Sequence, residues 1–137
     1  MLKTLSLAVA MTLSATGAAA AELTLEFPEV GGGGQVSIAV FDNGEGWLRR
    51  TRPVWAETRA VGAGPIRVTR DLPPGAYAVM AYHDRNANGR LDTLPVGLPT
   101  EAYGFSNNSR GLFGPPAWRQ AAFQLTGSGA RQLIRLR

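Results

Sequence analysis

The segment from Asp84 to Asp92 carries oxygen-bearing side chains at a regular spacing. Counted from Asp84, Asp or Asn stands at positions 1, 3, 5 and 9, and Gly89 stands at position 6. This is the front of an EF-hand-type calcium loop, in which alternate side chains converge on one ion and the glycine permits a sharp reversal. Calcium is therefore the expected ion, and the predicted ligands are Asp84, Asn86, Asn88, the carbonyl of Arg90, Asp92 and Glu101.

The same loop departs from an EF-hand at its far end. Pro95 occupies position 12, where an EF-hand carries a bidentate glutamate. Glu101, further along the chain, is the acid that could complete the calcium coordination shell. Because the loop offers few carboxylate ligands, a dissociation constant of about 10⁻⁴–10⁻³ M is expected. The alternative is a plain turn, because Asn88-Gly89 is a strong hairpin signal and Asp and Asn stabilise turns by themselves.

The polar residues near this loop do not form a convincing catalytic set. His83 is the only histidine and stands beside Asp84, but no second metal-ligating His or Cys accompanies it. Ser106 and Ser109 lack the glycine-flanked turn of a serine hydrolase. Asp84 and Asp92 could form a carboxylate pair for glycoside hydrolysis, yet their spacing makes them metal ligands first. A non-enzymatic protein is predicted, with a hydrolase as the least favoured alternative.

A long segment of low periodicity, residues 95–119, follows the loop and is rich in aromatic side chains. One interpretation is that its rings and amides bind a small carbohydrate or peptide, as apolar-plus-polar surfaces do. The other is that the rings form a satellite hydrophobic cluster beneath a long ordered loop. Under the first interpretation the ligand-binding residues are His83, Tyr103, Phe105, Asn107, Asn108 and Trp118.

The first 21 residues have the pattern of a secretory signal peptide. Lys3 precedes an apolar stretch that is too short to span a bilayer, and small residues lead up to a cleavage position after Ala21. The mature protein is expected to be periplasmic or secreted and to span no membrane. Residues 22–137 fit one domain, and the chain contains no cysteine, so no disulfide stabilises it.

The charge of the mature domain argues against one class of partner. Residues 22–137 carry 13 arginines, no lysine and 10 acidic residues. The arginines are scattered rather than gathered in a stripe with aromatic residues, so nucleic-acid binding is not expected. Because guanidinium groups form bidentate hydrogen bonds with carboxylates and phosphates, an anionic component of the cell envelope is a conceivable partner. A monomer is expected.

Apolar residues recur with a period of two, which is typical of strands rather than helices. Strands are predicted over residues 23–27, 35–42, 66–69, 76–83, 121–125 and 132–137, and the second and fourth are apolar on both faces. Residues 47–58 could form at most a turn or two of helix, since Pro53 interrupts them. The prediction is an all-β protein, a single immunoglobulin-like or transthyretin-like β-sandwich of about seven strands with one long ordered loop.

Three motifs occur in order along the mature chain: DLPPGAYAV at 71–79, HDxNxNGxLD at 83–92 and GLPxExYGFSNN at 97–108. Together they resemble the exported bacterial family known as domain of unknown function 2141. The LPPGxY element is also similar to a turn and strand of transthyretin-like and carboxypeptidase-regulatory-like sandwiches, where the tyrosine, here Tyr77, packs inward. The family resemblance implies an exported protein with no established activity.

Taken together, these observations predict an exported, non-enzymatic binding or structural module. Its calcium ion would tie residues 84–92 to Glu101 and thereby order the aromatic segment, residues 103–118. The alternative is a carbohydrate- or peptide-binding module that uses that aromatic segment.

Overall fold

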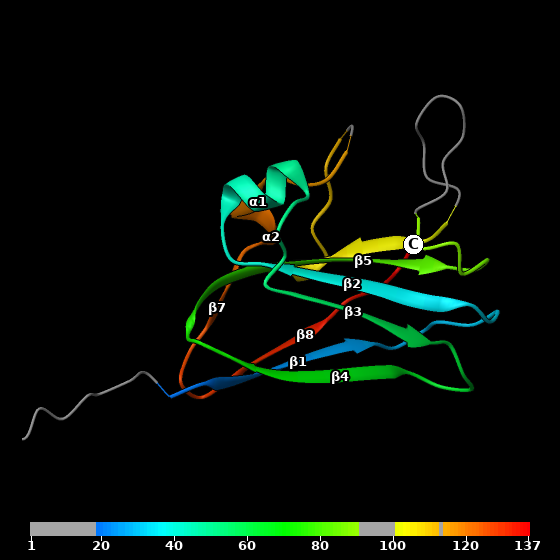
Figure 1. The fold of residues 1–137 in the computed structure, drawn as a ribbon, viewed down its shortest axis with the longest axis horizontal. Coiled ribbons are helices and arrows are strands. Elements are labelled where there is room, and N and C mark those ends of the chain that lie inside the picture. Colours follow the sequence, from blue (N-terminus) through cyan, green and yellow to red (C-terminus); the bar gives the residue numbers. More distant parts are fainter. Residues whose placement is uncertain (1–18, 91–100, 113) are drawn as a thin grey trace, which may run out of the picture.

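The computed structural model describes residues 19–90, 101–112 and 114–137, and its regular structure is mostly β (Figure 1). The elements in chain order are β1 (Ala21–Phe27), β2 (Gln35–Phe41), α1 (Gly44–Arg49), β3 (Trp55–Ala60), β4 (Ile66–Leu72), β5 (Gly75–Asp84), β6 (Tyr103–Phe105), the 3-10 turn η1 (Ser106–Asn108), α2 (Trp118–Ala121), β7 (Phe123–Leu125) and β8 (Ala130–Leu133). None of the helices in these ranges is long and apolar enough to cross a membrane.

The strands form two sheets that lie as separate layers in Figure 1. One sheet has the order β4-β1-β8, in which β1 pairs antiparallel with β4 and parallel with β8. The other has the order β3-β2-β5-β6, and β7 also pairs with β5. The predicted all-β sandwich is therefore confirmed, with eight strands in the described ranges rather than about seven.

The main core lies between the two sheets and follows the predicted alternation. In β1, Leu23, Leu25 and Phe27 are fully buried and face the inward side chains of β2 and β5. Each such side chain contributes roughly 1.5–3 kcal/mol when it leaves water. Since the described domain holds no disulfide, this burial is its main source of stability.

A second hydrophobic cluster covers the outer face of the five-stranded sheet. Phe41 of β2 and Ala78 of β5 point to this face and pack with Trp47 of α1, Phe105 of β6 and Ala121 of α2. Figure 1 shows both short helices beside this sheet. The second cluster explains why β2 and β5 carry apolar residues on both faces, as the sequence predicted.

The helix in this region is as short as predicted but begins before residue 47. α1 starts after Asn43, whose side-chain oxygen accepts a hydrogen bond of 2.7 Å from the main-chain N–H of Gly46. It ends at Arg50, which adopts a left-handed conformation. The prediction of at most a turn or two of helix is right in length, since α1 has 6 residues and ends before Pro53. Its position is wrong, because half of α1 precedes residue 47 and the chain from Trp55 onward pairs with β2 as β3.

Two further predictions need correction near the C-terminus. The segment 95–119 is not simply a loop, because its described part contains β6, η1 and the start of α2. The last assigned strand is β8, which begins two residues earlier than the predicted strand and ends before Ile134. Beyond β8 the chain still bridges the sheets, since Ile134 N donates to Glu26 O and Arg137 exchanges two main-chain hydrogen bonds with Tyr103.

Candidate functional site

The predicted calcium loop begins at the last residue of β5. Asp84 closes that strand and stands directly opposite Gln35, the first residue of β2, in the β2–β5 register. Its side chain is fully buried, with a relative exposure of 0%. A carboxylate in such a position is costly unless hydrogen bonds or a cation compensate for the lost water.

The Asp84 carboxylate holds the loop from its inner side. Its Oδ1 accepts a hydrogen bond from Asn88 N at 3.1 Å, and its Oδ2 accepts from Gly89 N at 2.7 Å and from Gln35 Nε2 at 3.2 Å. No arginine in the described part of the chain forms an ion pair with Asp84. An ionised carboxylate offers about four acceptor positions, so these three bonds leave capacity for a further partner.

The two asparagines of the loop form successive Asx-type turns. Asn86 Oδ1 accepts from Asn88 N at 3.3 Å, and Asn88 Oδ1 accepts from Arg90 N at 2.9 Å. Ala87 and Gly89 adopt positive φ values of 53° and 75°, which produce the reversal. These bonds satisfy the turn interpretation, and they also fix the side-chain oxygens that the calcium interpretation requires.

Glu101 lies beside the start of the loop, as the calcium prediction requires. It is buried, and its Oε1 accepts from Arg85 N at 3.2 Å. The neighbouring residue Ala102 accepts from His83 N at 2.8 Å, which joins the loop to the residues preceding β6. Asp92, the remaining predicted ligand, lies outside the described residues.

The acids alone do not make a metal centre. Within the described ranges, no three His, Cys, Asp or Glu side chains gather so that they could hold a metal ion. A calcium shell at this loop would therefore have to draw on amide and main-chain oxygens, and on Asp92, in addition to Asp84 and Glu101.

A glycine-rich turn packs against the back of the loop and was not recognised as part of it from the sequence. His83 Nε2 lies 2.6 Å from Gly33 O. Gly34 has a φ of +71°, and a Cβ there would lie only 2.3 Å from Asp84 O. The Gly34 position thus tolerates no side chain. No local signal could have revealed these contacts or that of Gln35, because they depend on the β2–β5 register.

The aromatic residues that were weighed as a ligand site pack mainly on one another. Phe105 is buried, and its ring centroid lies 5.9 Å from that of Trp47 and 5.7 Å from that of Tyr103. The Trp118 ring lies 6.4 Å from that of Trp47. This packing favours the interpretation as a satellite hydrophobic cluster.

The two asparagines of the predicted ligand site are used within the protein. Asn107 Nδ2 donates to the carbonyls of Gln120 and Ala122, and Asn108 Nδ2 donates to that of Leu133. Little amide capacity is left for a carbohydrate or peptide, so that alternative stays a prediction with weaker support than the calcium loop.

The fold and the loop define the class of protein: a two-sheet, all-β domain with a carboxylate-anchored turn at one end of its central strands. A sequence model for the bacterial family described as "Uncharacterized protein conserved in bacteria (DUF2141)" matches residues 31–132. The chain therefore belongs to this family, which confirms the predicted resemblance. No curated protein and no solved structure matches the chain.

Proposed function

We propose that this domain is an exported, non-enzymatic structural or binding module whose loop at residues 84–92 binds calcium. The observation that carries the proposal is the fully buried Asp84 carboxylate, which anchors the loop while no arginine of the described chain pairs with it. Main-chain N–H groups compensate part of its desolvation. A divalent cation at the remaining acceptor capacity would compensate the rest.

In this account the ion ties the loop to the residues that follow it. Glu101 already accepts a hydrogen bond from Arg85 N, so a shared ion would strengthen an existing contact. The brace is local. The aromatic segment from Tyr103 onward is ordered by the packing of its own rings. The proposed ion therefore holds only the loop and Glu101, whereas the sequence analysis expected it to order the aromatic segment as well.

Export supports the choice of ion. The signal-peptide pattern of residues 1–21 directs the protein to a compartment outside the cytoplasm. Extracellular calcium sites commonly have affinities of about 10⁻⁴–10⁻³ M, which suits a loop that lacks the closing glutamate of an EF-hand.

A non-enzymatic role is supported by the bonds of the groups weighed for hydrolysis. The His83 ring is bonded to the Gly33 carbonyl, and His83 is buried. Ser106 Oγ accepts from Val79 N at 2.9 Å and donates to Ala121 O at 2.6 Å. Both side chains therefore hold main chain in place rather than facing a substrate.

Thermal unfolding in calcium and in EDTA tests the proposal. At ten times the dissociation constant, a ligand that binds only the folded state stabilises it by about 1.4 kcal/mol. For a domain of this size that corresponds to roughly 5 °C in Tm. We expect this increase in the wild-type protein at about 10 mM calcium, and its loss in Asp84→Asn.

The matched control is Asp71→Asn, which removes an exposed carboxylate from β4. It should keep the full calcium response. For each variant, the difference between its Tm in calcium and its Tm in EDTA reports ion binding. This difference is separate from any loss of stability that the substitution causes in EDTA. An equal response in Asp84→Asn, or no response in the wild-type protein, would refute the proposal.

A further inference from the structure

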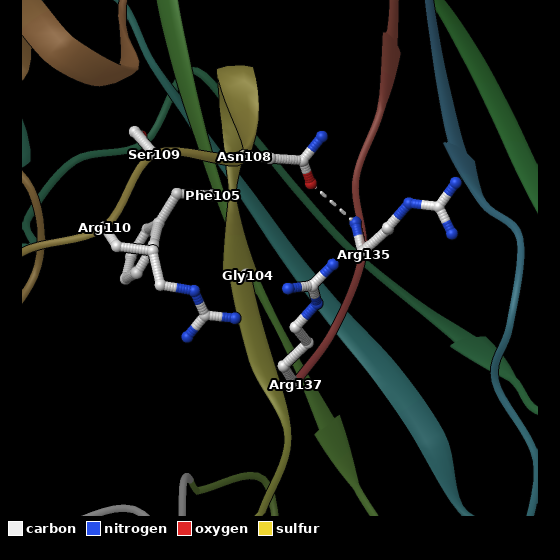
Figure 2. Close-up of a pocket in the computed structure, with 7 residues that line it drawn as sticks. All are labelled: Gly104, Phe105, Asn108, Ser109, Arg110, Arg135 and Arg137. Carbon is white, nitrogen blue, oxygen red and sulfur yellow. Dashed lines mark hydrogen bonds between the residues drawn. The ribbon is translucent and has the colours of Figure 1, made fainter.

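A small surface pocket lies where β6 and η1 meet the C-terminal segment, and its lining includes none of the predicted calcium ligands (Figure 2). Its volume is about 60 Å³, which leaves room for a few waters or one small ion. The lining residues are Gly104, Phe105, Asn108, Ser109, Arg110, Arg135 and Arg137.

The pocket lining is strongly cationic. It contains three arginines and no acidic side chain. Arg135 forms an exposed ion pair of 3.5 Å with Glu29, and Figure 2 shows its guanidinium extending away from the other two. Neither Arg110 nor Arg137 pairs with an acid of the described chain. If the protein ends at Arg137, its main-chain carboxylate adds one negative charge and the lining stays net positive.

The two remaining arginines both line the pocket. In Figure 2 the guanidinium groups of Arg110 and Arg137 lie on either side of Gly104. The Arg110 guanidinium carbon is 5.5 Å from the centroid of the Tyr103 ring, a cation–π contact that restricts its movement. Because both arginines line one small pocket, their like charges repel each other, and an anion between them would relieve this repulsion.

The main chain beneath these arginines is held rigidly. Asn108 Nδ2 donates to Leu133 O, and Asn108 Oδ1 accepts from Arg135 N, both at 2.9 Å. Arg137 and Tyr103 exchange two main-chain hydrogen bonds of 3.0 Å. A Cβ on Gly104 would lie 2.6 Å from Arg135 O, so this close approach requires glycine. Rigid walls lower the entropic cost of binding a ligand.

We propose that this pocket binds a phosphate group between Arg110 and Arg137. Each guanidinium can donate two parallel hydrogen bonds to phosphate oxygens. A phosphate monoester carries about −1.5 to −2 charges near neutral pH, which matches two arginines better than a single carboxylate does. The headgroup of an anionic phospholipid such as phosphatidylglycerol is a phosphodiester, which presents phosphate oxygens of the same kind but only one negative charge. Both a free phosphate monoester and such a headgroup therefore offer acceptors for the two guanidinium groups.

Calorimetric titration of the whole exported protein tests the site, performed in EDTA so that calcium plays no part. Inorganic phosphate and glycerol 3-phosphate are the free probes, and phosphatidylglycerol vesicles, with phosphatidylcholine vesicles as their reference, are the lipid probe. We expect saturable binding that persists at about 0.15 M sodium chloride. Arg110→Gln and Arg137→Gln should each weaken it by about tenfold or more, as expected for a lost charged hydrogen bond.

The control is Arg119→Gln, an exposed arginine on α2 outside the pocket, and it should bind like the wild-type protein. Thermal melts confirm that each variant is folded. Binding of the free probes identifies a soluble phosphate ligand, and binding of the anionic vesicles alone identifies a lipid headgroup; both support the site if the variants reduce it. Absence of saturable binding, or equal weakening in Arg119→Gln, overturns the proposal. Asp84→Asn should not affect phosphate binding, so this test and the calcium test fail independently.

Discussion

The proposed calcium loop and the second hydrophobic cluster stabilise neighbouring parts of the same sheet by opposite means. The loop is organised around one buried carboxylate and is held by hydrogen bonds that main-chain N–H groups donate to side-chain oxygens. The cluster is organised around Trp47, whose ring meets those of Phe41, Phe105 and Trp118 edge to face. Packing of this kind requires no bound ion, whereas an arrangement around a buried charge depends on what compensates that charge.

The two regions meet where His83 N donates to Ala102 O and Arg85 N donates to Glu101 Oε1. Beyond that boundary the aromatic residues need no ion to stay ordered. The proposed ion dependence is therefore confined to the loop.

Removing the centre of the aromatic cluster should have the largest effect. Trp47→Ala deletes a ring that is 3% exposed and leaves Pro116 O without its 2.8 Å hydrogen bond. We expect the free energy of unfolding in urea to fall by about 3–5 kcal/mol, with the same calcium response per molecule of folded protein. Leu48→Ala, on the exposed side of the same helix at 81% exposure, should change it by less than about 0.5 kcal/mol. A small effect of Trp47→Ala would show that the cluster does not stabilise the sheet.

Removing the anchor of the loop should have an intermediate effect. In EDTA, Asp84→Asn replaces one acceptor oxygen with an NH₂ group that opposes the N–H donors of Asn88 or Gly89. The expected loss in urea unfolding is about 1–3 kcal/mol. Asp71→Asn is again the control, and an unchanged stability of Asp84→Asn would contradict the anchoring role.

Tyr77 is held by burial of its ring and by a hydrogen bond from its hydroxyl group. Removal of that bond should have the smallest effect on the free energy of unfolding. The Tyr77 ring lies in the main core, and its hydroxyl donates to Pro73 O at 2.5 Å. Tyr77→Phe keeps the packing and removes the bond, so a loss of about 0.5–1.5 kcal/mol is expected near neutral pH.

The same residue gives a pH dependence. Burial, and secondly the charge of Asp42, raise the pKa of Tyr77 above its ordinary value of 10.0. A raised pKa in the folded state means that stability is complete below pH 10.0 and falls as the pH rises through the folded-state value. This part of the alkaline loss should be absent in Tyr77→Phe. If the free energy of unfolding fell identically with rising pH in the two proteins, the assignment of this loss to the Tyr77 hydroxyl group would be wrong.

Much of the fold was predictable because alternation is a local property. The strands around Leu25 and Val68 follow directly from a period of two, and the strand around Val79 was predicted from a short continuous apolar run. β3 was missed because its sequence, WAETRA, lacks an apolar alternation and pairs only because β2 lies beside it. The Asn43 cap of α1 was a local signal that could have placed that helix correctly.

The candidate site was predictable only in part, for the same reason. The Asx turns and the chain reversal at Gly89 depend only on neighbouring residues. The spacing of Asn and Gly therefore predicted this turn, and the structure contains it. The contacts of Asp84 with Gln35 and of Gly34 with the Asp84 carbonyl depend on strand register, which a single sequence does not contain. The arginine pocket was missed because Arg110 and Arg137 are distant in sequence and meet only through the pairing of Tyr103 with the C-terminal segment.

Amide NMR spectra recorded during a calcium titration show whether the ion binds at the loop. We expect saturable shifts for the main-chain N–H groups of Asn88, Gly89 and Arg90, with a smaller change at Arg85, whose partner is Glu101. The indole N–H of Trp47 should not move, since the aromatic cluster is independent of the ion. Unchanged loop resonances at about 10 mM calcium, or shifts centred on Trp47 instead, would contradict calcium binding at the loop.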